Sequence, residues 1–286
     1  MKCDCHIHIF MDGRNYRSAH DRHLDGVDES CIRSHFEEYK KRGITYVRDG
    51  GDHLFVSLKA KELAAEYGIV YRTPVFAIHK KGHYGSIVGR AFDNMKEFAG
   101  LVKEVRRLGG DFIKIMTTGI MDFQCAGTIT GERLDFSEVK EMVHIAHEEG
   151  FAVMSHTNGA EGVREAALAG VDSVEHGNYQ DEDSLQALKD SKAVWVPTLV
   201  TVRNLQKSGR FPRQEIEKIM VTQNRAVKKA YEMGLFMASG TDAGAYMVFH
   251  GESLKQEWEA FEGILEDKEA AAECLHSGNR EIIKRF

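Results

Sequence analysis

Four histidines and one aspartate lie at the ends of short apolar segments that are spread over the whole sequence. The segments DCHIHIF, AVMSHTNG, DSVEHGNY and SGTDAG supply, in this order, His6 and His8, His156, His176, and Asp242. Imidazole and carboxylate groups are ligands suited to zinc, manganese, iron or nickel. A single histidine is more often a hydrogen-bonded structural residue. Unrelated histidines, however, have no reason to recur at the ends of apolar, strand-like segments. The set therefore predicts a metal site.

A lysine lies inside another apolar segment, DFIKIMTTG, in the middle of a short β-type run. Side chains two residues apart share a face of a strand, so Lys114 would point to the same side as Phe112 and Met116. A buried ammonium group is costly unless it is paired, neutralised or bound. The residues alone leave two interpretations of Lys114: a role at the metal site, or an ion pair with an acidic neighbour such as Asp242.

These segments belong to a regular alternation of strands and helices. Eight strands are predicted, near Cys3–Phe10, Ile44–Arg48, Val70–Ile78, Phe112–Met116, Ala152–His156, Ser173–His176, Val194–Leu199 and Phe236–Ser239. Amphipathic segments such as DFSEVKEMVHIAHEEG lie between them and end at glycine, as helices often do. Eight such units fit an α/β fold with one (β/α)8 barrel of the TIM type, a single domain over residues 1–286. No GxGxxG or P-loop follows the first strand, which disfavours a doubly wound nucleotide-binding sheet.

The composition disfavours several classes of partner. The 286 residues are 42% hydrophobic and 29% charged, with a net charge of −6 and no run of basic residues. We therefore expect no binding to nucleic acid or to an anionic membrane. No apolar stretch approaches the roughly 18 residues of a membrane span. Five cysteines without CxxC spacing indicate reduced thiols, and the N-terminal segment lacks a signal-peptide pattern, so a cytoplasmic location is expected.

The segments DCHIHIF, DFIKIMTTG, AVMSHTNG, DSVEHG and SGTDAG, in this order, resemble the amidohydrolase superfamily. Within that superfamily, the closer resemblance is to the imidazolonepropionase-like branch, which includes metal-dependent dipeptidases. The segments GITYVRDGG and WVPTL also resemble this branch. The similarity runs from Asp4 to about His250. It implies two divalent metal ions, zinc before manganese, iron or nickel, bridged by a lysine that carbon dioxide has carboxylated. The implied ligands are His6, His8 and Asp242 for the more buried ion, His156 and His176 for the more exposed ion, and Lys114 for both.

The same resemblance implies hydrolysis of an amide or related C–N bond in a small molecule. A dipeptide, an N-acyl amino acid or a cyclic amide would be a suitable substrate. A hydroxide bridging the metals would attack the carbonyl carbon, because the metals lower its pKa and polarise the carbonyl oxygen. Asp242 would take the proton and pass it to the leaving nitrogen as a general acid.

Loop residues after the strands are predicted to contact the substrate, although loops carry weaker sequence signals. The candidates are His83 and Tyr84 in KKGHYGS, Tyr179 in EHGNYQDED, Arg48 at the end of the second strand and His250 in VFHGESL. The family often places a carbonyl-polarising histidine near His83 and a tyrosine near Tyr179. Arg48 could equally pair with Asp49. Structural roles also stay open for Tyr84 and His250.

One departure from the family concerns a small β-sandwich that most members of the branch carry on either side of the barrel. Here the first strand begins near Met1 and the chain ends in a helix-like segment, so the sandwich is expected to be absent. Assembly as a homo-oligomer is left open.

Three other functions are also left open. The first is a mononuclear deaminase or cyclic-amide hydrolase, which the presence of Lys114 and the distant position of Glu161 disfavour. The second is a lactonase or esterase with the same two-metal site, and the third is a non-catalytic binding barrel, which the complete ligand set disfavours.

Overall fold

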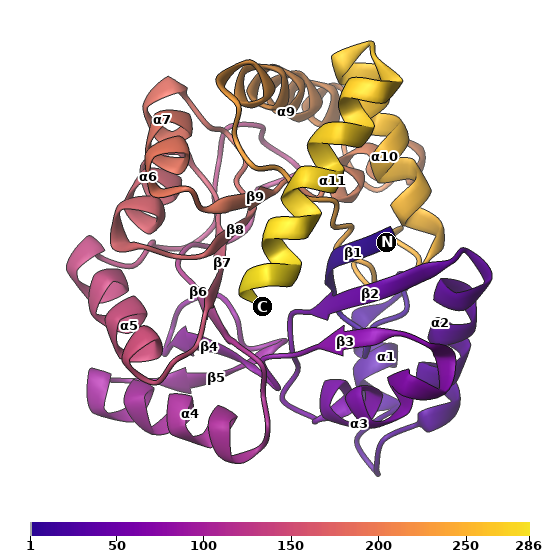
Figure 1. Ribbon diagram of the computed structural model, residues 1–286, viewed down its shortest axis with the longest axis vertical. Coiled ribbons are helices and arrows are strands. Elements are labelled where there is room, and N and C mark those ends of the chain that lie inside the picture. The colour runs from indigo at the N-terminus through magenta and orange to yellow at the C-terminus, as the bar shows by residue number, and fades with distance from the viewer. Residues whose placement is uncertain (1) are drawn as a thin grey trace.

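The computed structural model describes residues 2–286 as a set of central strands with helices around the outside (Figure 1). The strands are β1 Lys2–Ile7, β2 Ile44–Asp49, β3 Val70–Arg72, β4 Ala77–Lys80, β5 Gly89–Phe92, β6 Ile113–Met116, β7 Val153–Thr157, β8 Ser173–His176 and β9 Val194–Val196. The helices are α1 Tyr16–Asp21, α2 Glu29–Lys41, α3 Val56–Leu63, α4 Met95–Arg107, α5 Phe136–Glu148, α6 Ala160–Ala169, α7 Glu182–Ser191, α8 Val200–Arg203, α9 Arg213–Met233, α10 Glu252–Leu265 and α11 Lys268–Arg285. Short 3-10 helices lie at Ala64–Tyr67 and Asn204–Lys207. Within residues 2–286, no helix combines the length and the hydropathy needed to cross a bilayer.

The strands form two sheets, and within each sheet all paired strands are parallel. One sheet has the order β1-β2-β3, and the other has the order β5-β4-β6-β7-β8-β9. Met116 pairs with His156, and Thr157 pairs with His176, so the C-terminal ends of β6, β7 and β8 lie side by side. This arrangement confirms the predicted α/β fold with parallel sheets.

The predicted strand Val70–Ile78 is broken into two strands that belong to different sheets. β3 pairs with β2, whereas β4 pairs with β5 and β6. The break follows from Pro74, which has no N–H to donate, and from Val75, whose φ of 68° is incompatible with an extended strand. β5 was not predicted, because its four residues carry no distinctive apolar pattern.

The predicted strand Phe236–Ser239 is present only as a bridge, in which Met237 pairs with Trp195 of β9. On one side, Trp195 donates its N–H to the carbonyl of Phe236 and accepts one from Ala238, both at 2.9 Å. On the other side, Cys5 of β1 donates its N–H to the carbonyl of Ser239 at 2.9 Å. Residues 236–239 therefore connect the last strand of the second sheet to the first strand of the first sheet.

The C-terminal helix α11 packs against this connecting segment and reaches the centre of the strands (Figure 1). Asp267 caps its first turn by accepting two backbone N–H bonds. A Cβ at Gly278 would clash with the carbonyl oxygen of Met237, so glycine allows the close approach. The ring of Phe286 packs edge-to-face on Phe112 next to β6, with centroids 5.2 Å apart. Phe286 therefore belongs to the same buried apolar cluster as Phe112.

Candidate metal centre

The six predicted ligands line one cavity of about 490 Å³. The histidines come from the C-terminal ends of strands or the loop that follows, and the other two ligands from β6 and a loop: His6 and His8 from β1 and its loop, His156 from β7, His176 from β8, Lys114 from within β6, and Asp242 from the loop after residues 236–239. Parallel strands bring such positions to one edge, where α/β barrels carry their active sites. The structure therefore brings together residues that are far apart in the sequence.

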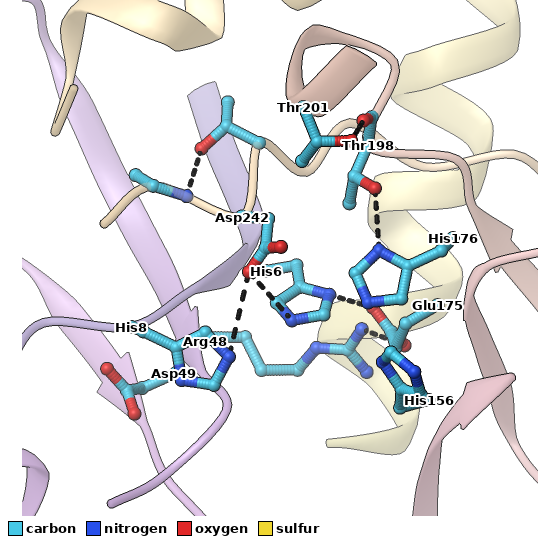
Figure 2. Close-up of polar contacts among 12 residues, drawn as sticks. His6, His8, Arg48, Asp49, His156, Glu175, His176, Thr198, Thr201 and Asp242 are labelled. Carbon is cyan, nitrogen blue, oxygen red and sulfur yellow. Dashed lines mark hydrogen bonds and ion pairs between the residues drawn. The ribbon is translucent and has the colours of Figure 1, made fainter. Parts of the chain in front are cut away.

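His6, His8 and Asp242 form the tightest group. One potential ligand atom from each lies within 4.8 Å of the other two. The carboxylate Oδ1 of Asp242 is 3.5 Å from His6 Nε2 and 3.6 Å from His8 Nε2 (Figure 2). Asp242 has a φ of 60°, a conformation that aspartate tolerates better than most residues, and its N–H donates to the His6 carbonyl at 2.7 Å. This turn directs the carboxylate toward both imidazoles.

A backbone contact and a glycine set the orientation of His8. Its Nδ1 lies 3.3 Å from the carbonyl oxygen of Gly51, which can only accept a hydrogen bond, so Nδ1 carries the proton. A Cβ at Gly50 would clash with the His8 ring, so that position must be glycine for the ring to fit. The Nε2 atom is left with a free lone pair on the side of Asp242, as a metal ligand requires.

His156 and His176 lie together beside this group, with ring centroids 4.7 Å apart. Nε2 of His156 is 3.1 Å from the carbonyl of Gly119, which leaves its Nδ1 free to act as a ligand. Nδ1 of His176 is 2.8 Å from Thr198 Oγ1 (Figure 2). The ring of His176 is also 5.0 Å from that of His6, so the two groups are neighbours.

Burial keeps all four imidazoles in the neutral form. Desolvation lowers the pKa of His8 and His156 to about 3, and the charge of Lys114 acts in the same direction. Desolvation also lowers the pKa of His6 and His176 well below the usual value. A neutral imidazole keeps a lone pair for a metal, so the four side chains are in their ligating form at neutral pH.

Lys114 carries a buried amine without a hydrogen-bond partner among residues 2–286. Its side chain is 1% exposed, and its Nζ has no hydrogen-bond partner within the part of the chain that the structure describes. Desolvation lowers its pKa to about 8, against the opposing charges of Glu175 and Asp242. Burial likewise raises the pKa of Asp242 to about 6. A buried amine without a protein partner is costly. Its place next to four neutral imidazoles and a carboxylate fits a site that a bound metal ion would complete.

Among the predicted substrate contacts, Tyr84 lines the cavity. Its ring centroid lies 5.1 Å from that of His156. Burial raises the pKa of the phenol well above its usual value, so the hydroxyl keeps its proton at neutral pH. Tyr84 is therefore placed to donate a hydrogen bond into the cavity.

The other four candidates do not line the cavity: Arg48, His83, Tyr179 and His250. Nδ1 of His83 lies 3.1 Å from the carbonyl of Glu132. His250 is buried, with one ring nitrogen 2.8 Å from the Met11 carbonyl and the other 2.9 Å from the Tyr39 hydroxyl. Both histidines already have protein partners, which explains why the structure holds them away from the cavity.

Arg48 and Tyr179 also belong to other environments. Arg48 is fully buried, and its guanidinium donates to the Cys5 carbonyl at 2.7 Å and to Glu175 Oε1 at 2.8 Å. Tyr179 packs on an apolar cluster that contains Met121. The carboxyl pairing predicted for Arg48 is thus made with Glu175 of the chain itself, and not with Asp49.

Several cavity residues were not predicted from the sequence. Asn158 and Asn178 each follow a candidate ligand histidine by two residues, and Asn178 Nδ2 donates to Asn158 Oδ1 at 2.8 Å. Their repeated spacing was a signal that could have identified them. Arg210 lies over the rings of Phe211 and Tyr246, 5.2 Å and 5.1 Å from the centroids. Nothing in the sequence joins these two loops, because they meet only in the folded chain.

A parallel α/β fold with histidines and a carboxylate at the C-terminal strand ends is typical of metal-dependent hydrolases. The chain belongs to the amidohydrolase family, whose model matches residues 3–274. Ochratoxinase of Aspergillus niger is 25% identical over 192 residues, which span 65% of this chain and 38% of ochratoxinase. The match therefore covers well under half of that relative.

Two solved structures show the same fold. A Xaa-Pro dipeptidase with bound methionine has a TM-score of 0.76 and 22% identity, covering 99% of this chain and 75% of the dipeptidase. The A. niger ochratoxinase structure has a TM-score of 0.78 and 19% identity, covering 98% of this chain and 70% of ochratoxinase. At these identities the likeness concerns the fold.

Proposed function

We propose that this chain is a metal-dependent hydrolase that cleaves an amide or related C–N bond in a small molecule. The observation that carries the proposal is the unpartnered buried Lys114 amine beside His6, His8 and Asp242 in one cavity. We also propose that the two sheets form one eight-stranded barrel, in which β3 and β4 together count as one strand, β5 is an additional edge strand, and residues 236–239 are the eighth, closing strand. The backbone hydrogen bonds of this segment to β9 and β1 support that closure.

The proposed centre takes two divalent ions, with zinc favoured because most of the ligands are imidazoles. The proposed ligands are His6, His8 and Asp242 for one ion, His156 and His176 for the other, and Lys114, as its carboxylated form, for both. Ions bound there would lower the pKa of coordinated water and polarise a substrate carbonyl. Manganese, iron or nickel would satisfy the same donor set.

The protein residues themselves supply proton transfer and orientation. The carboxylate of Asp242 accepts a proton from the attacking water and returns it to the leaving nitrogen, so that the C–N bond breaks as the new C–O bond forms. Asp242 is suited to this role because its side chain is 17% exposed toward the cavity and faces His6 and His8. Tyr84 keeps its hydroxyl proton and can donate a hydrogen bond to a substrate oxygen.

The cavity lining favours a substrate that carries an apolar group. Beyond the candidate ligands, most of the wall is apolar or aromatic, including Met11, Met121, Phe123, Leu205 and Phe211. The exposed Arg210 adds a cation at the same wall. An apolar pocket beside a guanidinium fits a dipeptide or an N-acyl amino acid with a free carboxylate better than a neutral cyclic amide. The solved dipeptidase of the same fold agrees with this choice.

A substrate screen tests the proposed function. The protein, expressed with added zinc or manganese and purified without chelators, is assayed against dipeptides, N-acyl amino acids, cyclic amides and lactones. We expect hydrolysis of amides with apolar side chains, lost after chelator treatment and restored by zinc. Turnover of lactones or esters alone would favour the esterase alternative, and deamination would favour the mononuclear one. Amide hydrolysis that chelators leave unchanged would contradict the proposal.

Arg210→Gln is expected to raise KM about tenfold for substrates with a free carboxylate, because a charge-assisted hydrogen bond is lost. The kcat value should change little, since Arg210 lines the cavity but is neither a candidate metal ligand nor the proposed proton-transfer group. Steady-state kinetics on an active substrate and on its carboxamide analogue measure the effect, which should vanish for the analogue. Arg213→Gln is the matched control, because Arg213 is exposed nearby and pairs with Glu217 outside the cavity. Equal KM changes for both substrates would rule out carboxylate recognition by Arg210.

A further inference from the structure

A fully buried ion-pair network lies directly beneath the candidate metal centre. Arg48 of β2 donates from Nη1 to Ser173 Oγ at 2.9 Å and from Nη2 to Glu175 Oε1 at 2.8 Å. Its Nε donates to the carbonyl of Cys5 in β1 at 2.7 Å. All three guanidinium nitrogens therefore have partners, and the side chains of Arg48 and Glu175 are completely inaccessible to solvent.

Glu175 uses its two oxygens differently. Oε1 accepts from Arg48 and also from Ser173 Oγ at 2.6 Å. Oε2 lies 2.9 Å from Nδ1 of His6 (Figure 2). Because Oε1 is held from two directions, the carboxylate cannot rotate freely, and Oε2 stays next to His6.

This contact favours the proton on Nδ1 of His6, because a lone pair there would face the negative charge of Glu175 at 2.9 Å. His6 is fully buried and neutral, so its ring has one N–H and one lone pair. A carboxylate can only accept, so the N–H belongs on Nδ1, beside Glu175. The lone pair is then on Nε2, which is 3.5 Å from Asp242 Oδ1 on the cavity side. Carboxylate partners of this kind fix the tautomer and the orientation of metal-ligating histidines.

Strand β8 contributes residues both to the candidate metal centre and to the ion-pair network beneath it. Ser173 and Glu175 are two residues apart on one face of β8, pointing to Arg48. His176 comes next and has a φ of 66°, so the chain leaves the strand geometry there and the imidazole reaches the cavity. One short strand thereby supplies a candidate ligand and the carboxylate that holds another ligand.

We propose that Glu175, held in place by Arg48 and Ser173, is a positioning residue that fixes His6 in its Nδ1–H tautomer and thereby sets the metal affinity of the centre. The metal part of this inference rests on the proposed function, whereas the tautomer part concerns the protein alone. Neither Arg48 nor Glu175 lines the cavity. Glu175 touches the site at His6, and its charge also acts on Lys114, which is why the tautomer of His6 is measured separately from zinc affinity. The ring of Phe286 at the end of α11, 4.3 Å from the guanidinium carbon of Arg48, covers the network from the opposite side.

Glu175→Gln gives a sharp test, because the amide can still accept from Arg48 and Ser173 with its oxygen. Its NH2 group would then face His6 and could only donate, so the His6 proton should move from Nδ1 to Nε2 and block the ligand lone pair. Long-range ¹H–¹⁵N spectra of protein labelled at histidine report the tautomer in the absence of metal. His6→Gln identifies the signal by its disappearance. Competition with a chromophoric chelator measures zinc affinity, which we expect to fall between tenfold and a hundredfold.

Two further variants keep the test decisive. Asp111→Asn is the matched control: Asp111 pairs with Arg72 and Lys61 away from the cavity, so the His6 tautomer and zinc affinity should stay as in the wild type. Arg48→Lys keeps the charge but loses the three-donor geometry, and it should weaken zinc binding if Glu175→Gln does not fold.

Different failures are distinguishable. If the wild type itself does not bind zinc, the proposed function fails, while the tautomer measurement still judges Glu175. If Glu175→Gln, or Arg48→Lys in its place, retains the Nδ1–H tautomer and wild-type zinc affinity, the positioning role is overturned and the proposed function is untouched.

Discussion

Asp242→Asn is expected to lower kcat/KM by a factor of about 10²–10⁴, the range that general acid–base groups contribute. The amide is nearly isosteric with the carboxylate, so its oxygen can still face His6 and His8. It cannot take a proton from the attacking water, however, and so has none to return to the leaving nitrogen. The backbone N–H of residue 242 still donates to the His6 carbonyl, so the fold should persist. Kinetics of the metal-loaded protein, with Tm and circular dichroism as checks, measure the effect.

Asp181→Asn provides the control for this prediction. Asp181 caps α7 by accepting from the N–H of Ser184, and asparagine is an equally good cap, so stability and activity should both be unchanged. If Asp242→Asn retained wild-type kcat/KM with normal metal content, the proposed proton transfer by Asp242 would be wrong. The substitution adds no bulk, so Tm should not fall. A large loss of Tm would show that the loss of activity reflects damage to the fold and not the loss of proton transfer.

The candidate ligands could be predicted because their signal is local. The spacing of His6 and His8 and the single lysine in β6 are visible in segments of a few residues, and parallel strands bring equivalent ends together wherever they lie in the chain. The break at Pro74 was also visible, since proline cannot donate to a ladder, but the apolar residues on either side suggested one continuous strand. Strand boundaries depend on pairings that the sequence of one segment does not contain.

The roles of Arg48 and Glu175 could not be predicted in the same way. Arg48 lies at a strand end and carries the charge that a substrate carboxylate would need, so substrate contact was a reasonable hypothesis. Its actual partner, Glu175, is 127 residues away in the chain and adjacent to a candidate ligand. Glu175 shares the strand face of Ser173, whereas the next residue, His176, reaches the cavity because its positive φ turns the chain out of the strand geometry. Only the folded geometry distinguishes the pairing of Arg48 with Glu175 from substrate contact.

Lys114→Met is the second prediction with a large effect. We expect metal content to fall from two ions per chain to one or none, and kcat/KM to fall by at least about 10², since a two-metal site provides several kcal/mol of transition-state stabilisation. The physical reason is the state of the amine: burial lowers the pKa of Lys114 to about 8, so a neutral fraction exists near neutral pH. Its nitrogen can bond to the carbon of carbon dioxide and release a proton, leaving a carbamate anion.

The measurement is metal content by mass spectrometry, with Lys80→Met as the control. Lys80 lies at the end of β4 and pairs with Glu138 at 2.9 Å, away from the cavity, so its loss should leave the metal content at the wild-type value. Lys114→Ala adds a second readout, because it leaves room for a small carboxylate such as acetate to take the place of the carbamate. Metal content and turnover that recover with added acetate would support the carboxylated bridge. An unchanged metal content in Lys114→Met would return this lysine to a structural or substrate-binding role and favour a single-metal centre built on His6, His8 and Asp242.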